Sequence, residues 1–140
     1  MTIETSVSLP ASVTEIDDYA FSDCSALVEV SIPSSVDEIG SCAFNYCTAL
    51  SSLVIPDSVT EIEEGAFSEC RALTTVVLPN SLTEISDYLF SYCASLSSIL
   101  IPDSVTEIET GAFQRCTALV KKEQQSKARS PTADVPCGTA

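Results

Sequence analysis

The sequence lacks the residues on which most catalytic and metal sites depend. There is no histidine, and only four glycines are spread over 140 residues. No Gly-rich phosphate loop and no G-x-S-x-G nucleophile motif occurs. Carboxylates are abundant, but they recur in columns that we expect to be exposed, where the desolvation that tunes an acid–base pair is missing. The sequence therefore predicts no enzyme, no catalytic residue, no cofactor and no metal site.

A long apolar run and an apolar start are also missing. No segment approaches the roughly 18 apolar residues that span a bilayer. The first ten residues, MTIETSVSLP, contain no basic start and no apolar stretch, so no secretory signal is visible. On the sequence alone, these absences favour an intracellular protein or a piece of a longer precursor.

Basic residues are scarce, with 6 Lys and Arg against 20 Asp and Glu. Residues 1–120 contain only Arg71 and Arg115 beside 18 acidic residues, whereas residues 121–140 contain four basic and two acidic residues. An acidic body argues against nucleic acid, whose own charge would be repelled. The charge either keeps the protein soluble or suits a basic partner or cations.

What the sequence does contain is a 23-residue frame that recurs without insertion or deletion. We place five copies at 7–29, 30–52, 53–75, 76–98 and 99–120, after a head at 1–6 and before a tail at 121–140. Such a period predicts a solenoid, in which each coil buries its apolar residues only against the neighbouring coils. The tail loses the repeat and is polar, so we expect it to be disordered.

Each copy predicts a short strand, a turn, a second short strand and a short helical turn. Apolar residues alternate at the start of the copy, as Leu53 and Ile55 do, and Pro56 then ends the strand. A second extended piece, VTEI, is followed by EEGAFSEC, which places Phe67 and Cys70 where a helical turn would point them inward. The expected fold class is an α/β repeat solenoid with parallel strands about 4.8 Å apart.

These columns resemble the leucine-rich repeats of the BspA-like, or Treponema pallidum, type. Their motif is roughly L-x-x-[IV]-x-[IL]-P-x-x-[VL]-T-x-I-x-x-x-A-F-x-x-C-x-x-L. It appears here as LVEVSIPSSVDEIGSCAFNYCTAL, LSSLVIPDSVTEIEEGAFSECRAL, LTTVVLPNSLTEISDYLFSYCASL and LSSILIPDSVTEIETGAFQRCTAL. Asp37 replaces the usual Thr, and Leu89 replaces Ala. The resemblance implies a right-handed curved solenoid that binds proteins, often at microbial or protist cell surfaces, and it provides no catalytic residues to transfer.

Five of the seven cysteines occupy one column of the repeat. Neighbouring members of a stacked column are about 5 Å apart, but their parallel Cβ directions suit a disulfide poorly. No Cys-x-x-Cys pair accompanies them, so a metal site is not expected either. We expect buried free thiols that pack as small apolar groups. The column is Cys24, Cys47, Cys70, Cys93 and Cys116, while Cys42 and Cys137 lie outside it.

One outward column consists of glutamates from the second short strand. Like charges about 5 Å apart in water repel by roughly 0.8 kcal/mol, so we expect stability to rise with salt or at mildly acidic pH. The column is either a solvated strip, a docking strip for a basic partner or a loose Ca²⁺ site. Its members are Glu15, Glu38, Glu61, Glu84 and Glu107.

Another outward column, on the first strand, is apolar in three successive copies. Val54, Val77 and Leu100 form an exposed stripe if that sheet faces solvent, and contiguous exposed apolar surface often marks a partner site. The alternative is that these residues only satisfy strand propensity or are covered by a flanking segment outside the sequence.

Two functions of different kinds fit these observations. The first is a protein–protein interaction module that uses the repeat surface as its docking face. The second is a structural spacer, or a fragment of a longer repeat array, without a ligand of its own. Neither end contains the polar capping repeat that shields a terminal coil, so end-to-end self-association through the terminal coils is also expected.

Overall fold

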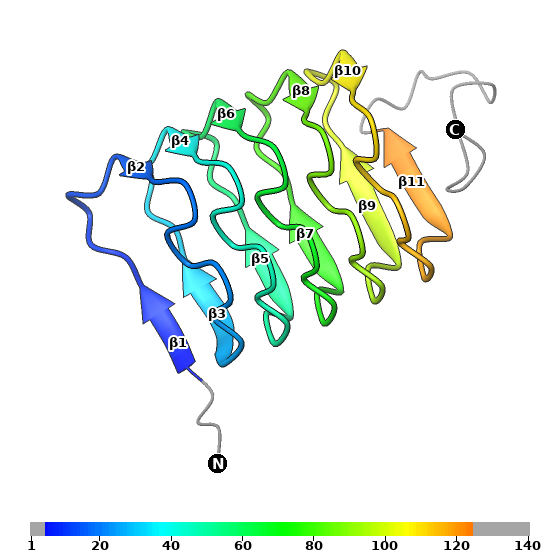
Figure 1. Cartoon of the computed structure of the whole chain (residues 1–140). Helices are drawn as coiled ribbons and strands as arrows, with labels where there is room; N and C mark the ends of the chain where they lie inside the picture. Colours follow the sequence, from blue (N-terminus) through cyan, green and yellow to red (C-terminus); the bar gives the residue numbers. More distant parts are fainter. Residues whose placement is uncertain (1–4, 125–140) are drawn as a thin grey trace.

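Successive copies of the repeat form successive coils of a solenoid, and equivalent strands lie side by side along it (Figure 1). The computed structural model describes residues 5–124. Each coil contains one longer strand and one two-residue strand, and every strand pairing is parallel. The expected class, a parallel repeat solenoid of the leucine-rich type, is confirmed.

The strands form two rows on different sides of the coil (Figure 1). The long-strand row is β1 (Thr5–Ser8), β3 (Leu27–Ser31), β5 (Ser52–Val54), β7 (Thr75–Val77), β9 (Ser98–Ile101) and β11 (Lys121–Gln124). The short-strand row is β2 (Glu15–Ile16), β4 (Glu38–Ile39), β6 (Glu61–Ile62), β8 (Glu84–Ile85) and β10 (Glu107–Ile108).

Paired residues are one repeat apart, as the pair Leu53 and Val76 and the pair Ile16 and Ile39 illustrate. Pairing joins β1 to β3, β5 to β7 and β9 to β11, and it joins β2 to β4 to β6 and β8 to β10. Over residues 5–124 no pairing joins β3 to β5, β7 to β9 or β6 to β8. Both rows are therefore interrupted at fixed places, although the coils remain stacked.

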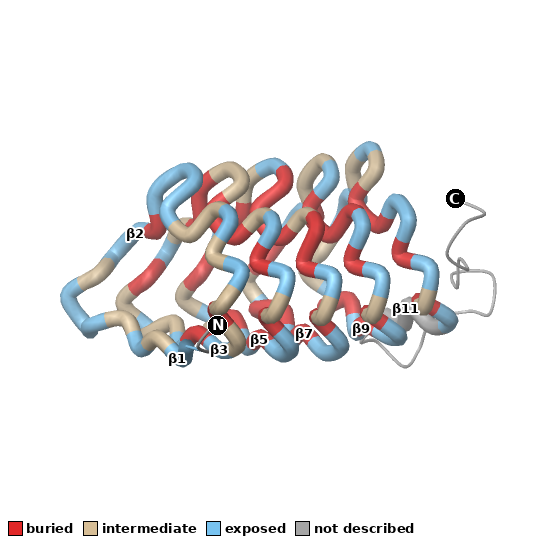
Figure 2. Tube along the Cα trace, turned by 60° about the horizontal axis from the view of Figure 1, so that its bottom comes forward, coloured by how far each residue is buried: buried red, intermediate tan, exposed pale blue. Residues whose placement is uncertain are grey.

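The core is a set of columns in which each buried side chain lies on its counterpart in the next coil. Figure 2 shows the buried positions along the inside of the coils. The phenylalanine rings stack with centroids 5.1–5.9 Å apart and interplanar angles of 4–17°. Stacked aromatic rings at this spacing stabilise beyond the area that they bury. The column is Phe21, Phe44, Phe67, Phe90 and Phe113.

The short helical turns that the sequence suggested are absent from residues 5–124, where consecutive turns replace them. Along these turns, backbone N–H groups bond alternately to a carbonyl of the next coil and to a carbonyl of their own coil. The N–H of Phe44 donates to Ala66 O at 2.8 Å, and the N–H of Cys47 donates to Phe44 O at 3.2 Å. A helix is excluded because its i→i−4 bonds would need all of these N–H groups.

Two residues in each coil, four positions apart, have positive φ and reverse the chain between these turns. Only two of the ten are glycine, and the other eight occupy a region that disfavours a side chain. The set is Tyr19, Asp23, Cys42, Tyr46, Gly65, Glu69, Tyr88, Tyr92, Gly111 and Arg115.

Serine and cysteine side chains tie each coil to the one before it. The hydroxyls of Ser35 and Ser58 donate to the carbonyls of Val13 and Val36, both at 2.6 Å. The thiols of the cysteine column from Cys47 onward donate to phenylalanine carbonyls of the preceding coil at 3.1–3.3 Å. These contacts give backbone carbonyls of one coil a side-chain donor from the next coil.

The cysteine column consists of free thiols, as predicted, and its last four members are buried. Burial, with the nearby Cys24, raises the pKa of Cys47 to about 12. Burial also raises the pKa of Cys70 well above its ordinary value. Such thiols are inert packing groups. Cys42 is a free, partly exposed thiol, and Cys137 lies outside the described residues.

One strand lies beyond the boundary that we predict between the repeats and the tail. Residues 121–124 form β11, which pairs with β9 in the register Lys121 with Ser98 and Lys122 with Ile99. Strand pairing uses backbone groups, so the frame continues for one strand after its apolar pattern has ended. The remainder of the expected disordered tail, 125–140, lies outside the described residues, as do residues 1–4 of the head.

We expect Phe67→Ala to lower the free energy of unfolding by about 3–5 kcal/mol, because a fully buried ring with two stacked neighbours is removed. Phe21→Ala is the matched control: this ring is partly exposed and has its one stacking partner in Phe44. Its loss should be clearly smaller. Urea unfolding followed by circular dichroism measures both, and equal losses would contradict a stack whose stability depends on nearest neighbours.

Candidate partner-binding surfaces

The outer side of the long-strand row exposes the apolar stripe of Val54, Val77 and Leu100. These residues are 63%, 54% and 49% exposed. β5 and β7 are paired, which places Val54 directly beside Val77. The adjacent outward column is also exposed but consists of hydroxyl side chains: Ser52, Thr75 and Ser98.

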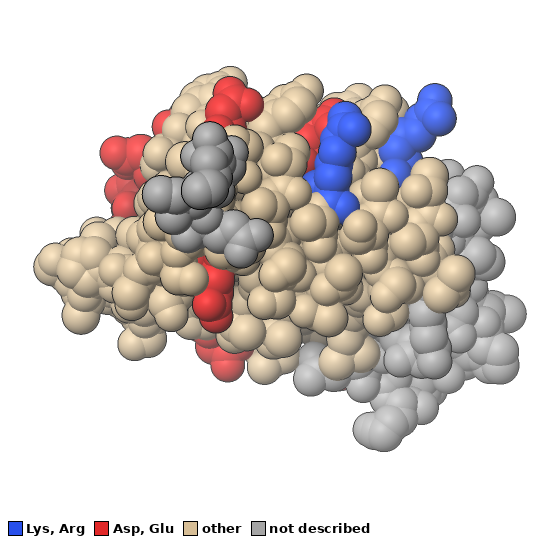
Figure 3. Space-filling model, turned by 90° about the horizontal axis from the view of Figure 1, so that it is seen from below, with Lys and Arg blue, Asp and Glu red and all other residues tan. Residues whose placement is uncertain are grey.

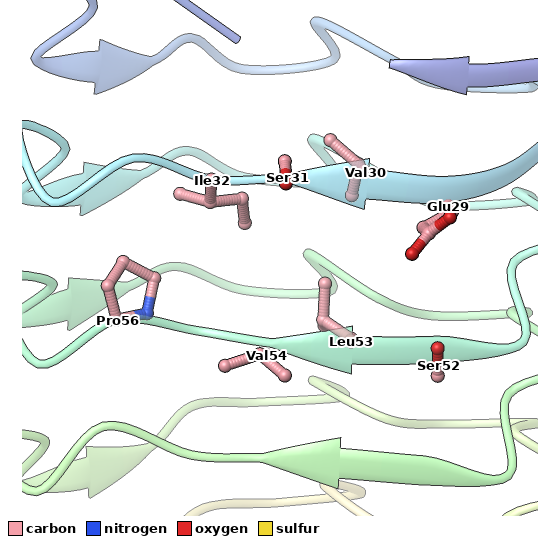
Figure 4. A pocket seen from close by; sticks show the side chains of 8 residues that line it. All are labelled: Glu29, Val30, Ser31, Ile32, Ser52, Leu53, Val54 and Pro56. Carbon is pink, nitrogen blue, oxygen red and sulfur yellow. The ribbon is translucent and has the colours of Figure 1, made fainter. Parts of the chain in front are cut away.

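A small cavity lies next to this stripe, between β3 and β5, which are not paired with each other. Its volume is about 250 Å³. Val30 and Leu53 are buried beneath it, and Ile32 and Pro56 are half-buried at one end. Its other lining residues, Glu29, Ser31, Ser52 and Val54, are exposed. Figure 4 shows the carboxylate of Glu29 in the space between the two strands.

Sequence reasoning missed this cavity, although one signal was available. Glu29 occupies the outward column in which the other copies have Ser6, Ser52, Thr75 and Ser98. It is the single charged residue of that column before β11. The missing pairing between β3 and β5, which opens the cavity, has no counterpart in the sequence pattern.

Charge is distributed unevenly over the surface. Seen from below, where the turns lead into the long strands, most of the surface is uncharged, with acidic groups in separate places and basic side chains near one edge (Figure 3). The outward positions of β5, β7 and β9 contain no charged residue at all. An uncharged face on an acidic protein avoids the cost of desolvating ions when it is covered.

The glutamate column is in register over two stretches of the short-strand row. Strand pairing places Glu15 beside Glu38 and Glu38 beside Glu61, and it separately places Glu84 beside Glu107. All but the half-buried Glu38 are exposed. Among residues 5–124, no group of three or more His, Cys, Asp or Glu side chains is placed to hold a metal ion.

Crowded carboxylates change the acidity of this row. A hydrogen bond with Glu63 raises the pKa of Glu38 to about 7, and partial burial and the charges of Glu15 and Glu61 add to this. The pKa of Glu109 is also raised, first by desolvation and then by the charges of Glu107 and Glu84. Like charges on adjacent strands disfavour the ionised form, so one carboxyl retains a proton at a pH where carboxyls are normally ionised.

Comparison with known proteins identifies the family. A model described as "BspA type Leucine rich repeat region (6 copies)" matches residues 2–120, and the chain belongs to this family. Membership supports a protein-interaction repeat module, and proteins of this kind are generally not enzymes. No curated protein matches the chain. Residues 5–124 contain no helix that is long and apolar enough to cross a membrane.

Solved structures show the same fold. A leucine-rich repeat protein of T. pallidum is 34% identical with a TM-score of 0.79, covering 87% of this chain and 71% of that one. One from Bacteroides ovatus is 32% identical with a TM-score of 0.69, covering 85% of this chain and 37% of that one. One from Eubacterium ventriosum is 26% identical with a TM-score of 0.79, covering 85% and 32%. The chain thus spans about a third of the length of the last two proteins.

Stability should fall as pH rises between about 4.5 and 7, because Glu38 binds its proton more tightly in the folded chain than in the unfolded one. The stabilisation that comes from the proton on Glu38 is fully present below the ordinary pKa of 4.5 and is lost as the pH passes about 7. We expect a higher Tm at about pH 5 than at about pH 8, and a smaller difference in Glu38→Gln.

The control is Glu29→Gln, which removes one carboxylate from the long-strand row. Thermal unfolding followed by circular dichroism provides the Tm at each pH. An equal pH response in the wild type and in Glu38→Gln would show that the Glu38–Glu63 contact does not hold a proton in solution.

Proposed function

We propose that the outer face of the long-strand row binds another protein, with Val54, Val77 and Leu100 as the central contacts. The observation that supports this most is the contiguous apolar stripe, exposed on neighbouring strands of a chain with a net charge of −14. Apolar surface of this kind is typical of interaction sites, and the adjoining Ser and Thr side chains can form the polar rim that such sites need.

The glutamate row is proposed as a second contact surface, for basic groups of the partner. Bringing cations against Glu15, Glu38, Glu61, Glu84 and Glu107 would relieve the repulsion within the row, and it would speed association through long-range attraction. This contribution should weaken with added salt, whereas the apolar contact should not.

The stripe can be tested by replacing Val54, Val77 and Leu100 with lysine. Buried charges without partners are costly, so capture of binding proteins from a microbial lysate on the immobilised chain should fall at least about tenfold. The matched control places the same three charges on exposed turn residues outside both proposed surfaces: Thr48, Ala94 and Thr117. Quantitative mass spectrometry of the captured proteins compares the two variants.

Retention of the same proteins by the stripe variant and the wild type would remove the stripe from the proposal. If neither chain captures any protein above a blank support, the spacer is favoured instead.

End-to-end association of chains is the second proposal, and it rests on the terminal coils. Apolar residues of the first coil, including Val7, Leu9 and Phe21, are only partly buried, and Ile108 in the last is 42% exposed. Stacking the first coil of one chain on the last coil of another would repeat the contacts between neighbouring coils.

Light scattering across a concentration series tests this association. The average mass should rise with concentration, and Phe21→Glu should abolish the rise. A constant monomer mass at the highest soluble concentration would overturn the proposal.

A further inference from the structure

The cavity between β3 and β5 on the long-strand face combines a negative charge with apolar walls. Ile32, Pro56 and the buried Val30 and Leu53 provide the apolar surface, and Glu29 lies at the opposite end (Figure 4). A volume of about 250 Å³ is below the roughly 300–1,000 Å³ of small-molecule pockets. It is suited to a single side chain rather than to a whole ligand.

Glu29 is available to a partner. Its side chain is exposed, and its carboxylate has no hydrogen bond or ion pair with another of residues 5–124. The ion pair within residues 5–124 does not involve Glu29: it joins Arg71 Nη2 to Glu69 Oε1 at 2.6 Å and lies in a turn. A carboxylate beside an apolar surface favours a side chain with an apolar stem and a cationic head.

The apolar stripe begins at the rim of this cavity, since Val54 belongs to both. From Val54 on β5 to Leu100 on β9 the distance is two strand spacings, about 10 Å. An extended peptide advances about 3.3 Å per residue, so roughly three residues cover the stripe. The cavity and the stripe together therefore match a lysine or arginine followed by a short extended aliphatic segment.

We propose that this composite site recognises an extended segment of a partner protein in which a lysine or arginine precedes aliphatic residues. The basic side chain enters the β3–β5 cavity, and its cationic head pairs with Glu29. The aliphatic residues cover Val54, Val77 and Leu100. A second copy of this chain is a poor occupant, because its repeats at 7–120 contain only two basic residues, Arg71 and Arg115, and Arg71 is paired with Glu69. The inference rests on the proposed function and adds the chemistry of the partner.

The test is an NMR titration of the isotope-labelled chain with an acetylated, amidated pentapeptide, Lys-Thr-Val-Thr-Val. Backbone amide signals of β3, β5, β7 and β9 should shift on addition of peptide at roughly 1 mM. An analogue with norleucine in place of lysine keeps the stem but lacks the charge, and it should bind about tenfold more weakly.

Glu29→Gln should weaken binding of the lysine peptide by about the same factor and leave the norleucine peptide unaffected. Glu64→Gln is the matched control, because it makes the same change at an exposed turn position outside both proposed contact surfaces, and it should leave binding unchanged. The two variants separate recognition by Glu29 from general attraction of a cation to an acidic protein.

Three outcomes would overturn the inference: no shifts at the highest peptide concentration, shifts centred on the short-strand row, or equal binding by Glu29→Gln and the wild type. Concentration-dependent shifts of the same signals without peptide would assign the face to a second copy instead. The proposed function and this inference can fail separately. If the lysine variant of the stripe loses protein capture but Glu29→Gln does not change binding of the peptide, the proposed function stands and only this inference is removed.

Discussion

Everything in this solenoid depends on contact between residues that are one repeat apart. Each phenylalanine ring lies on the ring of the next coil, and alternate N–H groups of the turn region donate across the same boundary. Serine and cysteine side chains add further bonds to the preceding coil. Because no coil contains a core of its own, the stability of each coil depends on its contacts with the two neighbouring coils. The terminal coils have such a neighbour on one side only and are less well covered.

This constraint separates the positions that specify the fold from those that are free to bind. Inward columns must hold nearly the same residue in each coil, since every side chain packs against its own counterpart. Outward columns are under no such restriction, and the changes from coil to coil occur there: Glu29 among hydroxyl residues, and Val54 after Ser31. The glutamate row is an exception, because it repeats on the outside, and its crowding helps to raise the pKa of Glu38 to about 7.

Most of the fold could be predicted because a repeated pattern gives the same information several times. The alternation before Pro56 and the recurring Phe67 column define strands and core without reference to distant residues. The turn region was predicted as helical because Phe67 and Cys70 are three positions apart, a spacing that helices and these turns share. Positive φ decides between the two, and among the ten positions only Gly65 and Gly111 carry the residue type that favours it; Tyr46 and Glu69 do not.

The sequence by itself determined the period, the buried columns and the outward placement of Val54, Val77 and Leu100, because each of these follows from the residue type at a fixed position of the repeat. The tertiary structure decided where pairing between strands is interrupted, and therefore that a cavity opens beside Glu29. It also decided that Lys121–Gln124 extends the long-strand row. Both depend on the relative placement of backbones from different coils, which a pattern of side chains along one chain does not specify.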